Sequence, residues 1–423
     1  MVKLFSFFCS LLIVANFCSC SGMIAAQKGD IAFYKANYLE AKENYKKSSE
    51  KKKTINRTIY LLNYSSSLFW NNEYSECLKT LEQAEKSNVS NRNPILSTLV
   101  AADRLPYKMK DYELAFLHFF KAVCYYKENE IEKALVELRK SIKCEPQSIF
   151  SELLLGLISA VELQDYNTAM VAMRRIISYN PDFLPGYDLL RGYLKLLGHI
   201  SESEDMANKL KSRQYNYNFL SDNRDNHYLL IFLDLPRSEK DINYSKTMLE
   251  IYNDLKTQYK ISEAQYNQNN QELLAVIFKE LSPSYQPVEP PKSALPINAL
   301  AILNDNFVKS YNTNIPEQRI KDILKNFVTD FLKDLIKDEA RKELTKDAKP
   351  VGWLIRGKDL LDPRYWNTLP GRFDVIVLKL PPDKYFITLK FFDEKNNYIS
   401  EKILENVEVL NNKLNLYFYR FVN

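Results

Sequence analysis

The residues that most often carry catalysis or hold metal ions are few and scattered in this chain of 423 residues. The three histidines are His118, His199 and His227, and no two of them lie close together in the sequence. None occurs in a His-x-x-x-His or Cys-x-x-Cys spacing, which would place two metal ligands on one helix face or one turn. The sequence also lacks a Gly-x-Ser-x-Gly elbow and a Walker-type phosphate loop. It therefore predicts no metal, no cofactor and no enzymatic activity.

His118 is the histidine with the most distinctive neighbours, since Phe116, Phe119 and Phe120 surround it in an apolar helical stretch. No nucleophile or second base stands near it in the sequence, so a hydrogen-bonded core or groove histidine is favoured over a catalytic base. The net charge of +5 is spread thinly along the chain. The one dense basic run, Lys46 to Lys53, is interpreted as a solvated helix end. Nucleic acid is not an expected partner.

The first twenty residues carry a targeting pattern. Lys3 supplies a short positive region, and a mostly apolar run from Leu4 to Phe17 follows it. That run is shorter than the roughly 20 residues a membrane-spanning helix needs. The pattern is typical of a secretory signal, so the protein is expected to be exported.

Cys20 is the residue for which the sequence indicates a specific chemistry. The apolar run ends in Phe17-Cys18-Ser19-Cys20, which resembles the lipobox of bacterial lipoproteins. That resemblance implies cleavage before Cys20 and acylation of its thiol, because small Ser19 precedes it whereas bulky Phe17 precedes Cys18. The expected location is a bacterial membrane, the outer membrane foremost, facing the periplasm or the cell surface. The alternative is a secreted protein cut near Ser21 or Gly22.

A repeated pattern of a polar turn followed five residues later by a small residue organises the N-terminal half. The small positions are Ala41, Cys77, Ala134 and Ala169, at spacings of 36, 57 and 35 residues. The pattern resembles the tetratricopeptide repeat, whose period is about 34 residues. The long spacing implies an insertion of about twenty residues around Asn91 to Tyr107. A fifth, degenerate repeat from Tyr187 to about Leu210 is expected to cap the array.

The residues that follow each small position support helix packing. Four residues later the chain has Tyr45, Leu81, Leu138 and Met173, and seven residues later Ser48, Ala84, Ser141 and Ile176. A small residue lets two helices approach closely, and large residues one turn later fill the groove between repeats. A single helical hairpin cannot bury its apolar face, so stacking of three or more repeats is required.

The first helices of such an array line its concave face, where partners are commonly bound. Tyrosine-rich surfaces suit protein recognition. The candidate binding residues on these helices are Tyr34, Tyr60, Tyr64, Phe69, His118, Lys121, Tyr125 and Tyr126. Packing between repeats is the alternative role for each of them.

The second half of the chain mixes strands and helices. A strand is predicted at Tyr228 to Leu233, and five prolines between Ser282 and Pro296 mark a boundary. Another strand is expected at Asn298 to Leu303. Pro316 to Lys342 is an amphipathic helix, expected to pack on a sheet, with a partner or membrane surface as the alternative.

The C-terminal tail predicts at least four strands that form an antiparallel sheet. They are Phe373 to Leu380, Tyr385 to Phe392, Ile403 to Val409 and Leu414 to Val422. The first of them carries apolar residues on both faces, which indicates burial on both sides. Pro381-Pro382 and Asn396-Asn397 are expected to form turns.

The segment before these strands carries one family-like motif, Arg364-Tyr365-Trp366-Asn367-Thr368-Leu369-Pro370. It resembles the C-terminal signature of an uncharacterised bacterial lipoprotein family with tetratricopeptide-like repeats, in which Arg-aromatic-Trp-x-Thr-Leu-Pro precedes a strand, a Pro-Pro turn and another strand. Asp383 stands where that turn usually has glycine. The family is often found beside curli-secretion-channel-like lipoproteins, so the resemblance implies a role in envelope assembly. Trp366 and Arg364 are interpreted as a wedge and its hydrogen-bonding partner, fixing the loop against the sheet.

Together these patterns predict an α+β protein, with an N-terminal tetratricopeptide-type α-solenoid followed by a smaller α/β domain that contains an antiparallel C-terminal sheet. The expected divisions are a signal at 1–19, repeats at 20–215, a connector at 216–296 and a C-terminal domain at 297–423. The predicted function is a membrane-anchored scaffold that binds envelope proteins, other lipoproteins among them. A glycan-capture or nutrient-capture lipoprotein of an outer-membrane importer is the alternative.

Overall fold

A computed structural model describes most of the repeat region and the C-terminal strands. The described residues are 22–51, 54–89, 106–213, 227–238, 292–293, 297–303, 306–313 and 365–422. The signal, Cys20, most of the expected insertion, the segment 239–291, the helix predicted at Pro316 to Lys342, and Arg364 lie outside them.

The chain forms two compact units, each assembled from separate stretches of sequence. The first contains Met1–Glu113, Ile242–Glu289 and Pro316–Thr368, and the second contains Leu114–Asp241, Pro290–Ile315 and Leu369–Asn423. The second unit therefore combines helices of the repeat region with strands from the C-terminal region.

Helical hairpins build the N-terminal half. A helical segment over residues 22–34 is followed by α2 (Tyr38–Ser49), α3 (Arg57–Trp70), α4 (Tyr74–Val89), α6 (Asp111–Lys127), α7 (Ile131–Cys144), α8 (Ile149–Glu162), α9 (Tyr166–Tyr179), α10 (Leu184–Leu196) and α11 (Ile200–Ser212). In the first unit α3 packs against α2 and α4, and in the second unit α7 to α11 pack each against the next. No helix in the part of the chain that the structure describes is both long and apolar enough to cross a membrane.

The repeat positions predicted from the sequence are all buried inside these hairpins. Ala41, Ala134 and Ala169 have no exposed surface, and Cys77 is 1% exposed. The large and small residues four and seven positions later are also fully buried. In the fifth pair, α10 and α11, the equivalent positions are Ser203, Ala207 and Leu210, of which Ser203 and Leu210 are buried and Ala207 is half-buried. The tetratricopeptide-type pattern is therefore confirmed as the packing pattern of the first four helix pairs, and the fifth pair keeps it in part.

Each hairpin turn has one residue with a left-handed backbone, five positions before the small residue. These residues are Ala36, Asn72, Asn129, Gln164 and Gly198, with φ between +56° and +82°. The next backbone N–H turns back to a helix carbonyl, as in the bonds from Asn37 to Ala32 (2.9 Å) and from Glu73 to Leu68 (2.9 Å). This is the Schellman-type helix end that a left-handed residue permits. The constant spacing shows that the turn and the small residue form one local unit.

Two four-stranded sheets lie in the second unit. The first has the order β10 (Asn415–Arg420), β1 (His227–Leu235), β7 (Arg372–Leu380) and β6 (Tyr311–Asn312). The second has the order β5 (Asn306–Lys309), β4 (Ile297–Leu303), β8 (Asp383–Asp393) and β9 (Tyr398–Val409). A short parallel pair joins β2 (Arg237–Ser238) to β3 (Lys292–Ser293).

The strands pair differently in two respects from the simple antiparallel tail that the sequence suggests. β7 and β8 are consecutive but lie in different sheets, so Pro381-Pro382 is a corner between sheets and does not close a hairpin. Proline has no N–H to donate to a ladder, so a strand breaks at this point. β10 runs parallel to β1, with Asp234 beside Arg420, whereas the remaining pairs in the two four-stranded sheets are antiparallel.

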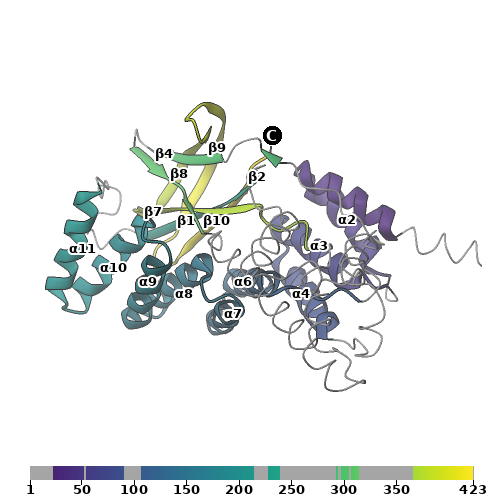
Figure 1. Cartoon of the computed structure of the whole chain (residues 1–423), viewed down its shortest axis with the longest axis horizontal. Helices are drawn as coiled ribbons and strands as arrows, with labels where there is room; N and C mark the ends of the chain where they lie inside the picture. Colours follow the sequence, from purple (N-terminus) through teal and green to yellow (C-terminus); the bar gives the residue numbers. More distant parts are fainter. Residues whose placement is uncertain are drawn as a thin grey trace, which may run out of the picture. The chain divides into compact units, whose positions relative to one another are not determined.

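The sheet β10-β1-β7-β6 is covered on both faces, which explains the apolar residues on both faces of β7. On one side, β1 and β7 form a shared core with β4, β8 and β9 of the other sheet. On the other side, Phe232 and Phe373 contact Phe119 of α6 at ring-centroid distances of 5.7 Å. Phe373 also contacts Phe150 of α8 at 5.9 Å. Figure 1 draws α8 and α9 beside this sheet.

The left-handed turn at Ala36 generates a testable prediction. Its φ of +56° brings Cβ close to the backbone, a strain of about 1–2 kcal/mol. Ala36→Gly removes that strain. The greater conformational freedom of glycine in the unfolded chain cancels about 0.5–1 kcal/mol of the stability gained. We expect the free energy of unfolding in urea to rise by about 0.5–1 kcal/mol.

The matched control is Ala41→Gly, a change of the same chemistry inside α2. Ala41 is fully buried in a helix, so its replacement by glycine lowers the free energy of unfolding by about 1 kcal/mol. A loss of stability of similar size in both variants would contradict the left-handed turn at Ala36.

Candidate binding site

The eight predicted binding residues fall into two groups, one in each unit. Tyr34, Tyr60, Tyr64 and Phe69 belong to the first unit, and His118, Lys121, Tyr125 and Tyr126 lie along α6 in the second. Five of them are buried and only Tyr64, Tyr125 and Tyr126 are half-buried. The structure therefore places most of these side chains in contact with the chain itself. Their part in binding a partner stays a prediction.

Tyr126 holds the start of β10 onto α6. Its hydroxyl donates to the Glu162 carboxylate at 2.5 Å, lies 2.8 Å from the Leu414 carbonyl, and accepts from the Leu414 N–H at 3.0 Å. Burial, then the hydrogen bond to Glu162, raises the pKa of this tyrosine well above its ordinary value. A neutral hydroxyl with these three partners serves as an internal anchor.

His118 and Lys121 belong to a buried charge cluster around Glu137 of α7. His118 Nδ1 lies 2.6 Å from one Glu137 oxygen, and Lys121 Nζ lies 3.2 Å from the other. Burial opposes ionisation of Glu137, but hydrogen bonds from His118 and Lys140 and the charge of Lys121 outweigh it and hold its pKa at about 2. His118 is thus a hydrogen-bonded core residue that joins α6 to α7, the role that its aromatic surroundings favour.

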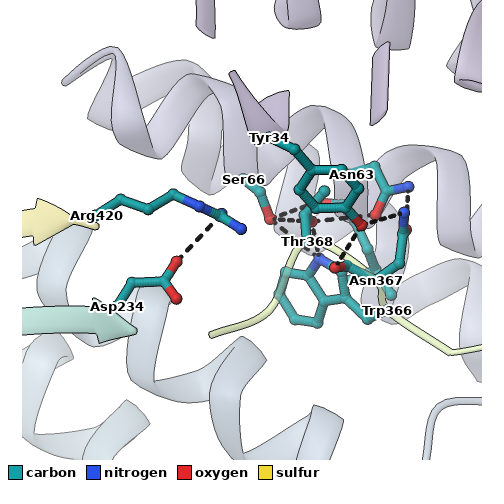
Figure 2. A network of polar contacts seen from close by, with 9 residues as sticks. Tyr34, Asn63, Ser66, Asp234, Trp366, Asn367, Thr368 and Arg420 are labelled. Atoms are coloured by element: carbon teal, nitrogen blue, oxygen red, sulfur yellow. Dashed lines mark hydrogen bonds and ion pairs between the residues drawn. The ribbon is translucent and has the colours of Figure 1, made fainter. Parts of the chain in front are cut away.

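A buried polar network in the first unit holds the segment Trp366–Thr368, which carries the family-like motif (Figure 2). Asn63 of α3 donates to the Asn367 side-chain oxygen at 2.7 Å and accepts from the Thr368 hydroxyl at 3.1 Å. The Trp366 indole N–H donates to Ser66 at 3.0 Å, and that hydroxyl also lies 2.8 Å from the Thr368 hydroxyl. We call this network, together with Tyr34 and Glu113, the α3 clamp.

Tyr34 and Glu113 complete the α3 clamp by bonding the main chain of the segment. The Tyr34 hydroxyl donates to the Asn367 carbonyl at 3.1 Å, and the Glu113 carboxylate accepts from the Trp366 N–H at 2.6 Å. Glu113 also accepts from the Tyr107 hydroxyl and from the Lys110 N–H. Burial raises the pKa of Glu113, and the donors around it act in the opposite direction. The clamp therefore binds both the backbone and the side chains of a segment about 300 residues distant in sequence.

Trp366 is buried. Its indole N–H donates to Ser66 of α3 and to Thr368, and its backbone N–H donates to Glu113 of α6. The interpretation of Trp366 and Arg364 as a wedge and its hydrogen-bonding partner stays a prediction. The adjoining Leu369 and Pro370 are also buried. The side chain of Arg364 lies outside the described residues.

Sequence reasoning missed Asn63, Ser66 and Glu113. A signal was present for the first two, because α3 is strongly apolar and yet carries Asn63, Ser65, Ser66 and Ser67 on faces that would otherwise be core. Buried polar residues are hydrogen-bonded almost without exception, so such residues indicate a partner. No local pattern says that the partner is Asn367 or Thr368.

An open groove of about 540 Å³ lies in the second unit among α7, α8 and α9. Its lining residues are Arg139, Ile142, Lys143, Glu152, Leu155, Asn167, Thr168, Val171, Ala172 and Arg175. None of the predicted binding residues lies in it. The described residues include no group of three His, Cys, Asp or Glu side chains that could hold a metal ion.

No protein-family model and no curated protein matches the sequence. Among solved structures, a tetratricopeptide repeat protein from Parabacteroides merdae is 19% identical, with 47% of this chain and 69% of that chain covered and a TM-score of 0.36. MamA protein is 17% identical, with coverages of 46% and 92% and a TM-score of 0.36. YrrB, described as a TPR protein with an unusual peptide-binding site, is 11% identical, with coverages of 46% and 86% and a TM-score of 0.35. Likenesses of this size carry no argument about the function of this chain.

The α3 clamp predicts a measurable loss of stability when Asn63 is shortened. Asn63→Ala removes the donor to Asn367 and leaves that buried side-chain oxygen without it, which costs about 1–3 kcal/mol. We expect the free energy of unfolding in urea, followed by circular dichroism, to fall by that amount.

The control is Asn44→Ala on α2, where the exposed amide bonds only to the Glu40 carbonyl. This change is expected to alter stability by no more than about 0.5 kcal/mol. If the two variants unfolded at the same urea concentration, the α3 clamp would not stabilise the first unit.

Proposed function

We propose that this protein is a membrane-anchored scaffold of the bacterial cell envelope, which binds other envelope proteins as part of an assembly complex. Two features support the proposal. The helix pairs form an array of the tetratricopeptide type, and the targeting pattern ends at Cys20.

The α3 clamp is the observation that carries the protein-binding part of the proposal. Asn63 and Ser66 are three residues apart, so both side chains project from one face of α3. Together with Tyr34 they hold a segment of irregular chain through side-chain and main-chain hydrogen bonds. The first-helix surface of this array is therefore chemically suited to holding polypeptide. In the first unit this surface holds a segment of the same chain. A partner would be held by the same kind of hydrogen bonds, to its side chains and its main chain, on surfaces that remain open.

The direct test is recovery of a partner from the membrane. The full chain, carrying a C-terminal affinity tag, is crosslinked in its native cells and purified from detergent-solubilised membranes. The proposal predicts one or more envelope proteins at constant ratio to the tagged chain and their absence from an unrelated tagged lipoprotein. Repeated recovery of the protein alone would contradict a scaffold role.

The anchoring part of the proposal depends on the thiol of Cys20. Three acyl chains bind a membrane firmly, because each buried CH₂ contributes about 0.8 kcal/mol and one chain alone is marginal. Cys20→Ser removes the acceptor and is expected to move the exported protein from the membrane fraction to the soluble fraction. Mass spectrometry should then find an N-terminal peptide without the added mass of the lipid.

Cys18→Ser is the matched control, since it changes the neighbouring thiol without touching the expected acylation site. It should leave both the membrane fraction and the lipid mass unchanged. A wild-type N-terminus that begins at Ser21 or Gly22, with no lipid, would contradict the anchor.

A further inference from the structure

The groove among α7, α8 and α9 combines a basic rim with an apolar floor. Arg139 and Lys143 lie one turn apart on α7, and Arg175 faces them from α9. All three side chains are exposed. Neither Arg139 nor Lys143 forms a hydrogen bond or an ion pair with any residue that the structure describes. The charge of Arg139 helps to lower the pKa of Asp165, so Asp165 is the carboxylate that an acidic ligand would compete with at this side chain.

Glu152, on α8, supplies a single acceptor in the wall of the groove. Its side chain is fully buried and one oxygen accepts from Arg175 at 3.2 Å. The other oxygen has no hydrogen-bond partner within the described chain. A buried acceptor in this state is uncommon in folded proteins. Because the Glu152 side chain has no exposed surface, a donor from a ligand reaches this oxygen only when the side chains above it shift.

Aliphatic side chains occupy the space between these charges. Val171 on α9 is 42% exposed, Ile142 is half-buried, and Leu155 is buried beneath them. Val136 on α7 is 47% exposed and precedes Arg139 by three residues, so it extends the same helix face. The groove can therefore contact small apolar side chains as well as carboxylates.

The arrangement of the second unit leaves this side open. The phenylalanines of α6 and α8 are covered by β1 and β7, so the first-helix face of these repeats is occupied by the sheet of the same chain. α7 and α9 are the second helices of their pairs. The groove opens on the second-helix side, where Arg139, Lys143, Val171 and Arg175 are exposed.

We infer that the groove among α7, α8 and α9 is a docking site for an acidic segment of a partner protein. Carboxylates of the segment meet Arg139, Lys143 and Arg175, small apolar side chains lie on Val171 and Ile142, and one N–H or amide donor reaches Glu152. This inference rests on the proposed scaffold function. The charge of the rim selects acidic partners, and the aliphatic side chains of Val171 and Ile142 favour a peptide over a bare phosphate.

The test uses the full-length protein in detergent and fluorescent nine-residue peptides. One set contains Asp, Glu, Val and Asn, and the control set has Lys in place of every Asp and Glu. Vesicles of phosphatidylglycerol serve as a second anionic probe. The decisive variant is the pair Arg139→Glu and Lys143→Glu. The matched control is Lys209→Glu and Lys211→Glu on α11, which makes the same charge change at exposed positions outside the groove.

Acidic peptides should bind the wild-type protein, and basic peptides should not. The double substitution at Arg139 and Lys143 (the groove pair) should weaken binding of the acidic peptides at least tenfold. The double substitution at Lys209 and Lys211 (the α11 pair) should change it less than twofold. Thermal unfolding verifies that both pairs are folded. A photo-crosslinking amino acid at position 171 should label the acidic peptide, whereas one at position 196, exposed on α10, should not. Three results would each overturn the inference. The acidic peptides do not bind the wild type, or the substitutions in the groove and on α11 weaken peptide binding equally. The third is that the protein binds vesicles but no peptide, and the groove substitutions abolish the vesicle binding.

The partner recovered from membranes separates this inference from the proposed function. If the groove pair still recovers the partner that the wild type recovers, the scaffold function stands and the groove assignment fails. If the wild type recovers no partner at all, the proposed function fails.

Discussion

In the second unit, phenylalanine rings of α6 and α8 pack directly on one face of the sheet β10-β1-β7-β6. Phe373 is the centre of this contact, since it stacks on Phe232 at 5.1 Å and meets Phe116, Phe119 and Phe150 within 6 Å. Each such ring buries about 150–250 Å² and each ring pair adds about 0.5–1.5 kcal/mol beyond its area. The helices and the sheet therefore share one core, and neither can bury its apolar face without the other.

This shared core determines which surfaces remain for binding. Tetratricopeptide-type arrays offer their first-helix face to partners, but in the second unit β1 and β7 cover that face. In the first unit, the α3 clamp places the chain's own Trp366–Thr368 segment on α3. The chain thus uses first-helix surfaces twice for its own folding. The basic groove among α7, α8 and α9 lies on the opposite, second-helix side of the repeats in the second unit.

The sequence was most informative where structure is local. Periodicities of 3.6 and 2 residues depend only on neighbouring side chains. They predict the small residues such as Ala134 and Ala169, the large residues four positions later, and the strands β1, β4 and β7 to β10. The left-handed turns were also accessible, because Asn72 and Asn129 occupy a fixed place before each small residue.

Long-range partners could not be predicted from those patterns. The parallel pairing of Asp234 with Arg420 and the bond from Asn63 to Asn367 join residues 186 and 304 positions apart, and no local propensity specifies them. The groove was missed for a different reason. Arg139, Lys143 and Arg175 resemble any solvated helix face in sequence, and only the packing of α7 and α9 on α8 brings them together around Glu152.

Hydrogen exchange of the wild-type protein, measured by mass spectrometry at increasing urea, tests the shared core most directly. If α6 and α8 form one core with β1 and β7, their slowest amides exchange through the same opening and show equal free energies and equal dependence on urea. If the amides of β1 and β7 exchanged at lower urea than those of α6 and α8, the sheet and the helices would be separate cooperative units, and a single shared core would be contradicted.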